Sequence, residues 1–295
     1  MKDYLKHYQM FDYRARCVVV STKDIVTTLQ QRHKLDPITT IALGRAINCA
    51  AMLASTLKSE VDYISCTWRG KGLLETVFAE CNGAGECRGY TTPESVAEDL
   101  EIAELMPEKV SDVLGSEGTL TVIHGRRDGV SKPYTAILEF MNGEIASDIA
   151  HYLAESEQIP SAVAAGVKLS PTGEVLSSGG VLVQKIAGTN LDEKTLKELE
   201  VNMAEKLNIS DRLAKGESVV DILNFLTNDT EEHTLLLARD LSFKCTCSRD
   251  RMSSALVLLG EDQIKTILDE FGKIETRCPF CAHTELFSLE ELTRQ

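Results

Sequence analysis

Cys245-Thr-Cys247 and Cys278-Pro-Phe-Cys281 are two cysteine pairs near the C-terminal end of the sequence, with thirty residues between them. Pairs with one-residue and two-residue spacers are typical of tetrahedral zinc sites, because one backbone turn then directs both sulfurs at an ion about 2.3 Å away. The alternative, four unrelated buried cysteines, is disfavoured by paired spacing at both ends of a short segment. The pattern therefore predicts a zinc site made of Cys245, Cys247, Cys278 and Cys281, with no coordination position left open for a substrate or an activated water.

The segment that carries these cysteines has too few apolar residues to fold securely alone. A module of about fifty residues buries little core, and structural zinc contributes about 10–16 kcal/mol in small peptides. We expect zinc removal to unfold it. Thiolates are also the oxidisable form of cysteine, and each ligand has a neighbouring thiol able to close a disulfide. The spacing alone is equally compatible with a static zinc clamp and with a switch that oxidation opens.

The composition describes an ordinary acidic globular protein. The 295 residues are 43% hydrophobic and 26% charged, with a formal net charge of −14. This charge disfavours nucleic-acid binding by the surface as a whole. The first seventeen residues lack the apolar core of a signal peptide, and we expect no stretch of membrane-span length. These features predict a cytoplasmic protein, in which nine cysteines suggest metal or redox chemistry more than a structural disulfide framework.

The hydrophobic pattern predicts an α+β protein of three regions. Residues 1–187 should form an N-terminal α/β core domain with a largely antiparallel sheet, because short apolar runs follow one another with Gly-containing turns. Within it, Asp36-Pro37 should begin a long helix. Residues 188–240 have narrow apolar faces at helical spacing, so we expect a helical linker that depends on docking for stability. Residues 241–295 should form the C-terminal four-cysteine zinc and redox-switch domain.

Two segments resemble a known family. One is Phe243-x-Cys245-x-Cys247-Ser-Arg-x-Arg251 with the later Cys278-x-Phe-Cys281, and the other is Asp148-x-Ala-x-Tyr-Leu-x-x-Ser-Glu-Gln158-x-Pro160. Together they are similar to the bacterial redox-regulated chaperones of the heat shock protein 33 family (33 kDa chaperonin), over nearly the whole chain. The sequence departs from the family pattern at Glu285, where a tyrosine is usual, and at Ala187 and Leu73, where prolines are usual.

The resemblance implies an ATP-independent holdase without catalytic residues. In the reduced, inactive form one zinc ion would be bound by the four cysteines. Oxidation would form Cys245–Cys247 and Cys278–Cys281 disulfides, release zinc, and unfold the C-terminal domain and then the linker. The exposed surface, whose residues the sequence does not specify, would bind unfolded client proteins, and oxidised chains would form homodimers. Neither nucleic acid nor membrane is an expected partner.

Two other classes of function remain as alternatives. A zinc ribbon that binds nucleic acid or protein is favoured by Arg249 and Arg251 but opposed by the net charge of −14. A thiol–disulfide enzyme would need one exposed Cys-x-x-Cys at a helix N-terminus, which the paired Cys-x-Cys fits poorly.

The remaining cysteines have open roles. Cys81-Asn-Gly-Ala-Gly-Glu-Cys87 reads either as a second redox pair or, in the favoured interpretation, as two reduced cysteines flanking a tight turn. The sequence does not assign Cys17, Cys49 or Cys66.

Overall fold

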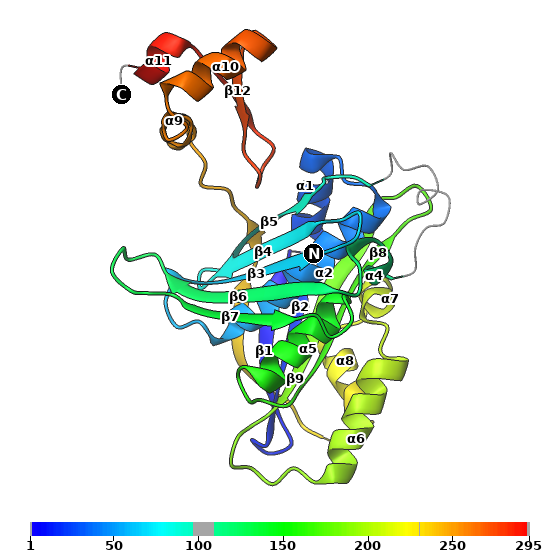
Figure 1. Cartoon of the computed structure of the whole chain (residues 1–295). Helices are drawn as coiled ribbons and strands as arrows, with labels where there is room; N and C mark the ends of the chain where they lie inside the picture. Colours follow the sequence, from blue (N-terminus) through cyan, green and yellow to red (C-terminus); the bar gives the residue numbers. More distant parts are fainter. Residues whose placement is uncertain (1, 97–108, 230, 294–295) are drawn as a thin grey trace. The chain divides into compact units, whose positions relative to one another are not determined.

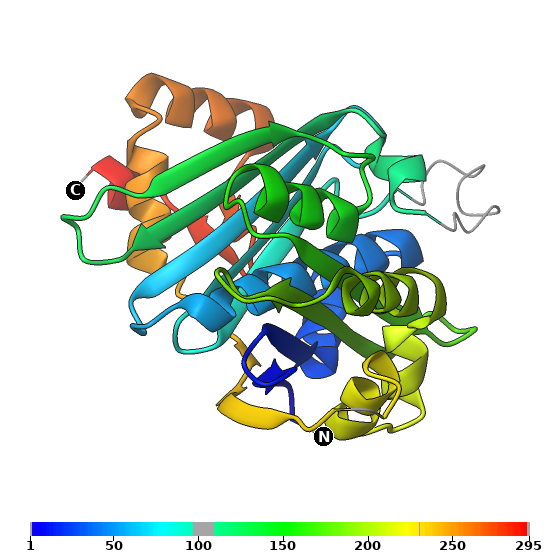
Figure 2. The same ribbon diagram turned by 90° about the horizontal axis from the view of Figure 1, so that it is seen from below.

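The computed structural model describes residues 2–96, 109–229 and 231–293, and the chain divides into two compact units, Met1–Phe243 and Lys244–Gln295 (Figure 1). The first unit contains two sheets. The five-stranded sheet has the order β10 (Thr234–Asp240), β1 (Tyr4–Met10), β2 (Ala15–Ser21), β9 (Val175–Lys185) and β8 (Ser161–Leu169). The six-stranded sheet, whose strands lie side by side in Figure 2, has the order β11 (Ser242–Phe243), β5 (Glu86–Thr92), β4 (Thr76–Asn82), β3 (Asp62–Gly70), β6 (Gly118–Arg126) and β7 (Tyr134–Glu139).

The strand pairing confirms the predicted α+β class with largely antiparallel sheets. Every neighbouring pair is antiparallel except β11 and β5, which are parallel. Besides α2, described next, the described residues before 188 form the helices α1 (Lys23–His33), α4 (Ser111–Leu114) and α5 (Ile145–Glu155), with a 3-10 turn at Ala54–Thr56.

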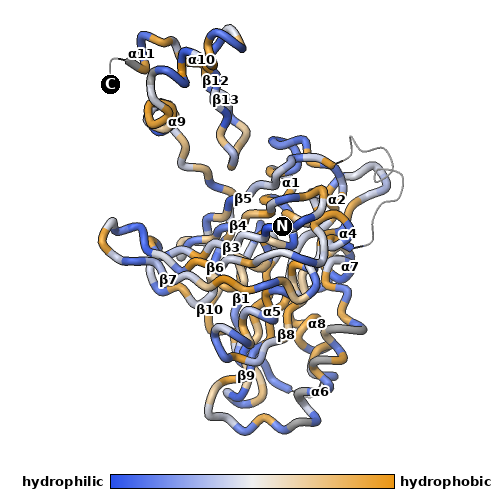
Figure 3. The backbone as a smooth tube through the Cα atoms, viewed as in Figure 1, coloured by the Kyte–Doolittle hydropathy of each residue, from blue (hydrophilic) through white to orange (hydrophobic). Residues whose placement is uncertain are grey.

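Helix α2 (Pro37–Leu53) lies between the two sheets and organises the main core. The Asp36 side chain accepts the Thr39 N–H at 2.8 Å, and Pro37 fits the first turn because it has no N–H to satisfy. Its side chains pack in one buried cluster with Val18 of the five-stranded sheet and Trp68 of the six-stranded sheet. Figure 3 shows the apolar segments that run through α2 and the strands around it.

The same helix corrects one expectation. Pro37–Thr56 is 20 residues long with a mean hydropathy of 1.3, so one stretch does have the length and composition of a membrane span. Within the fold, 89% of the most apolar 18-residue stretch of this segment is buried. The apolar character therefore has a simpler cause, which is that a helix between two sheets contacts protein on all sides.

Strand β2, in the middle of the five-stranded sheet, is buried on both faces. In β2, Val18 and Val20 face the main core, whereas Cys17 and Val19 belong to a second buried cluster on the opposite face. Successive side chains of a strand point to opposite faces, so a continuous apolar run is what a doubly covered strand requires. This explains the sequence Cys-Val-Val-Val at residues 17–20.

Short helices of the predicted linker cover the second face. They are α6 (Glu193–Val201), the π-helical turn Asn202–Lys206, α7 (Ile209–Ala214) and α8 (Val219–Leu226). Ile222 and Leu223 of α8 are fully buried in the second cluster, and Ser218 forms a capping box with Asp221 at the start of the helix. The prediction of helix through residue 240 is wrong for Thr234–Asp240, which forms β10 and pairs with β1.

The second unit has a small core of its own. It consists of α9 (Arg249–Val257), α10 (Glu261–Phe271), the hairpin β12 (Ile274–Arg277) and β13 (Thr284–Phe287), and α11 (Leu289–Thr293). Of the apolar residues between the two cysteine pairs, Leu256 and Ile264 are buried, but Phe271 is 68% exposed. The number of buried side chains in this unit is small for a free-standing domain, so its stability depends on the site described below.

Asp3 provides a pH-dependent contribution to the stability of the first unit. Its buried carboxylate accepts the Asp24 and Ile25 N–H groups at the start of α1, at 3.1 and 2.8 Å. Burial raises the pKa of Asp3 from 3.8 to about 6, against the opposing effect of these hydrogen bonds. The folded state therefore binds this proton more tightly than the unfolded state, and the contribution of Asp3 to stability falls as pH rises from about 4 to about 6.

We expect the unfolding free energy of Asp3→Asn, relative to wild type, to rise by about 2–3 kcal/mol across this pH interval. The fluorescence of Trp68, the single tryptophan, reports unfolding of this unit. Asp192→Asn is the control, because the Thr195 N–H lowers the pKa of this exposed carboxyl and the relative slope should have the opposite sign. Equal stabilities of Asp3→Asn and wild type at every pH would contradict the assignment.

Candidate metal centre

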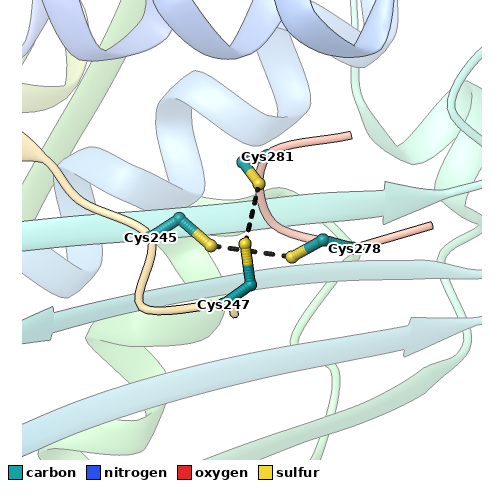
Figure 4. Close-up of side chains that lie close together, drawn as sticks. All are labelled: Cys245, Cys247, Cys278 and Cys281. Atoms are coloured by element: carbon teal, nitrogen blue, oxygen red, sulfur yellow. Dashed lines mark hydrogen bonds between the residues drawn. The ribbon is translucent and has the colours of Figure 1, made fainter. Parts of the chain in front are cut away.

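The four cysteines singled out in the sequence lie together in the second unit. Cys245 and Cys247 lie between β11 and α9, and Cys278 and Cys281 lie in the loop that joins β12 to β13. Their sulfur atoms all lie within 4.8 Å of one another (Figure 4). Sulfurs bound tetrahedrally to one zinc ion at about 2.3 Å would be roughly 3.8 Å apart. The cluster therefore has the donor atoms and the size that one such ion requires.

Two close sulfur contacts join cysteines of different pairs. Cys245 Sγ is 3.6 Å from Cys278 Sγ, and Cys247 Sγ is 3.4 Å from Cys281 Sγ. All nine cysteines are free thiols. Each sulfur of one cysteine loop thus contacts a sulfur of the other loop, as expected when four ligands surround one point.

Local hydrogen bonds hold each cysteine loop in a tight turn. The Ser248 hydroxyl caps α9 by accepting the Arg251 N–H at 3.3 Å, and the Arg251 guanidinium donates to the Thr246 carbonyl at 2.7 Å. In the other loop, Cys278 donates its N–H to the His283 carbonyl at 2.9 Å and accepts the Ala282 N–H at 3.0 Å. Each turn directs its two thiols to the same side of the backbone, which is the reason for the short spacers in the sequence.

The pKa values of Cys245, Cys247 and Cys278 are shifted in different directions. Burial raises the pKa values of Cys245 and Cys247. Burial alone would also raise the pKa of Cys278, but hydrogen bonds from the Phe280 and Cys281 N–H groups lower it overall. Backbone donors favour a thiolate at Cys278, and binding of a cation would displace protons from the others.

Arg249 is a structural residue of this site that the sequence did not identify as such. Its guanidinium donates to Glu285 at 2.5 Å, to the Leu286 carbonyl at 2.8 Å and to Glu291 at 3.1 Å, and it stacks over the Phe287 ring. Arg249 thereby joins α9 to β13 and α11. Glu285 stands where a tyrosine is usual in the family, and its carboxylate forms an ion pair with Arg249.

The side chains of His283 and Ser156 both make contacts of a structural kind. The His283 ring is 2.8 Å from Glu285 Oε1, outside the four-sulfur cluster. Ser156, at the end of α5, is 3.0 Å from the Tyr134 hydroxyl. Next to it, the Tyr152 hydroxyl donates to Glu157 at 2.5 Å. These contacts give the Ser-Glu-Gln segment at the end of α5 a structural role.

A two-sheet α+β unit followed by a small unit with four clustered cysteines defines a class of chaperone with a cysteine cluster able to hold a metal. The family model described as "Hsp33 protein" matches residues 3–288. The chain belongs to the Hsp33 family, as its resemblance in sequence predicts.

Known proteins match this chain over nearly their full lengths. The chain is 34% identical over 290 residues to the 33 kDa chaperonin of Bacillus licheniformis, covering 98% of this chain and 97% of the relative. It is 32% identical over 293 residues to the 33 kDa chaperonin of Clostridioides difficile, with 99% and 98% covered. The crystal structure of the 33 kDa chaperonin from Thermotoga maritima superposes with a TM-score of 0.86 at 29% identity, covering 100% of this chain and 97% of that one.

Proposed function

We propose that the protein is a redox-regulated, ATP-independent holdase, inactive when reduced and active when oxidised. The observation that carries the proposal is the convergence of four thiols in a unit with little other core. A unit stabilised mainly by its thiols loses its fold when those thiols react with each other instead of binding a metal.

Cys245, Cys247, Cys278 and Cys281 would hold one zinc ion in the reduced protein. When bound, zinc supplies structural cross-linking of the two cysteine loops, with no open position for catalysis. The tight turns around Ser248 and Cys278 keep the four sulfurs oriented for it.

Oxidation would join Cys245 to Cys247 and Cys278 to Cys281. Each disulfide removes two electrons and two protons from a thiol pair, and a hydroperoxide accepts them as its O–O bond breaks, giving water and an alcohol or a second water. The second unit would then lose its main source of stability. The alternative pairing, Cys245 with Cys278 and Cys247 with Cys281, joins sulfurs that are 3.6 and 3.4 Å apart across the site.

The helices α6–α8 provide the surface that the switch would uncover. They are short, and their buried side chains cover an apolar face of the five-stranded sheet. If unfolding of the second unit spreads to this region, both the helices and the sheet face become available. Apolar burial of about 25 cal/mol per Å² would then hold unfolded client proteins without sequence specificity.

We also propose the oligomeric partner and the cellular location that the sequence leads us to expect. Oxidised chains would pair as homodimers through newly exposed apolar surface, and the protein would act in the cytoplasm without enzymatic turnover. A nucleic-acid role is less well supported, since Arg249 and Arg251 are both engaged in contacts within the unit.

The test combines metal release with client protection. Zinc-loaded protein is treated with hydrogen peroxide under mild warming, while a chromophoric chelator follows zinc and light scattering follows a thermally unfolding client. We expect scattering to be suppressed only after zinc leaves, and suppression to disappear when a dithiol reductant and zinc are restored. Zinc release with unchanged client aggregation would contradict the holdase proposal.

Peptide mapping of the same sample tests the disulfide pairing. Trypsin places Cys245 and Cys247 in the peptide 245–249, and Cys278 and Cys281 in the peptide 278–294. Each peptide should lose two hydrogens without joining the other. A cross-linked pair of these peptides as the main product would show that sulfurs of different cysteine pairs react and that the proposed pairing is wrong.

A further inference from the structure

A second pair of thiols lies in the first unit, in the hairpin formed by β4 and β5. Cys81 and Cys87 are directly opposite each other in the antiparallel register, and both side chains are 0% exposed. A hydrogen bond to the Cys81 thiol, together with burial, raises the pKa of Cys87 well above its ordinary value. Directly opposed strand residues have their Cβ atoms about 4.5–5.5 Å apart, so a disulfide needs only a small local adjustment.

The C-terminal end of the first unit covers this hairpin. Ser242 of β11 pairs with Glu86, and Phe243 pairs with Cys87 itself. The Ser242 N–H donates to the Gly85 carbonyl at 3.0 Å, and Leu241 is buried in the same core cluster as the two thiols.

The hairpin turn fits closely against the chain that precedes β11. If another residue replaced Gly85, its Cβ would lie 2.3 Å from the Asp240 carbonyl oxygen, and the φ angle of Gly85 is +85°. Only glycine combines this backbone conformation with so close an approach. The turn is therefore shaped to receive residues 240–243, the segment that leads directly to Cys245.

We propose that Cys81 and Cys87 are a second redox pair, which forms a disulfide across the hairpin when Leu241–Phe243 leaves the edge of β5. While the segment is in place, the thiols are shielded from solvent and resist oxidation because the reactive thiolate is disfavoured by burial. When it leaves, β5 becomes an edge strand beside the opened core, and an oxidant gains access. The pair would thus respond to detachment of β11 and not to oxidant alone.

The reaction needs one hydroperoxide for each disulfide. One thiolate attacks the peroxide oxygen and breaks the O–O bond, giving a sulfenic acid and releasing water or an alcohol after proton uptake. The other thiolate attacks this sulfur, the S–O bond breaks, and water leaves with the remaining proton. Two thiols lose two electrons in total, and the peroxide gains them.

The experiment uses the full chain, because each thiol pair falls in a separate tryptic peptide. Peptide 72–88 contains Cys81 and Cys87 and no other cysteine, and peptide 17–23 contains only Cys17. Protein is treated with excess hydrogen peroxide, quenched in acid, unfolded, alkylated and digested. Loss of two hydrogens from peptide 72–88 reports the disulfide, and two alkyl groups report free thiols. Cys17, equally buried, is the reference for general exposure.

Two variants detach the segment in different ways. Leu241→Ala weakens its packing in the core, and Ser242→Pro removes the N–H that donates to Gly85 without changing a core side chain. We expect disulfide formation in peptide 72–88 to be at least tenfold faster in both than in wild type. Leu74→Ala is the matched control. This leucine is fully buried and lies just before the start of β4, whereas Cys81 lies near the end of that strand. The rate of disulfide formation in this variant should stay near that of wild type.

Trp68 fluorescence first establishes that each variant is folded before oxidant is added. The proposal fails if Cys81 and Cys87 remain free in both detached variants, or if Leu74→Ala accelerates their oxidation as much as Leu241→Ala does. It also fails if Cys17 and the pair react at the same rate, since exposure would then be global. None of these results depends on holdase activity, so the proposed function and this inference are tested separately.

Discussion

Cys278→Ser is expected to lower zinc affinity by about 100-fold or more and to unfold residues 244–293 under reducing conditions. A site of four thiolates contributes about 10–16 kcal/mol, so one ligand accounts for roughly 3 kcal/mol. The serine hydroxyl does not replace it, because it stays protonated near neutral pH and is a harder donor than a thiolate. Cys278 is also the thiol whose pKa the Phe280 and Cys281 N–H groups lower, so serine leaves these donors without a thiolate.

Competition with a chromophoric chelator measures the affinity, and amide NMR signals of the second unit measure its folding. Leu258→Ser is the matched control, since it introduces the same side chain in the same unit at a residue that is 88% exposed. Its zinc affinity should equal that of wild type. A Cys278→Ser protein that binds zinc as tightly as wild type would show that Cys278 is not a ligand.

Ile222→Ala is expected to destabilise the packing of α8 on the five-stranded sheet by about 2–5 kcal/mol. Ile222 is fully buried in the second core cluster, where its side chain packs with residues of the sheet and of neighbouring helices. The substitution leaves a cavity beneath a helix of only eight residues, which has little stability apart from its docking. Val220→Ala, on the exposed side of the same helix, should change stability by less than about 0.5 kcal/mol.

Hydrogen exchange of the α8 amides measures this effect directly, and client aggregation measures its consequence. If α6–α8 cover client-binding surface, reduced and zinc-loaded Ile222→Ala should suppress aggregation without any oxidant, whereas Val220→Ala should not. Fast exchange in Ile222→Ala combined with no protection of the client would place the client-binding surface elsewhere.

The elements that could be predicted from sequence are those whose causes are local. The four-cysteine cluster follows from spacers of one and two residues, and α2 begins where Asp36 and Pro37 are found. The β-branched run at residues 17–20 predicts β2, although the reason for its length, burial on both faces, is visible only in the fold.

The elements that were missed depend on distant partners. The Leu-Leu-Leu sequence of β10 suits a helix as well as a strand, and Leu235 and Leu236 are 48% and 53% exposed. What makes this segment a strand is pairing with β1, more than two hundred residues away. The apolar pattern also does not mark β1 or β5. In β5 the cause is local, because Gly89 weakens the strand signal. Arg249 likewise gains its role from three elements that only the fold brings together.

The pairing of β1 with β10 also has a consequence for the order in which the protein is made. The strand β1 is synthesised more than two hundred residues before its partner on the outer edge, which is complete only at Asp240. Until then the edge of β1 has unpaired backbone groups, which favour association with other chains. Closing so long a loop is also slow compared with local folding. A nascent chain of this protein would therefore depend on the later synthesis of β10 to protect the edge of β1, and truncation before residue 234 should make the first unit prone to aggregate.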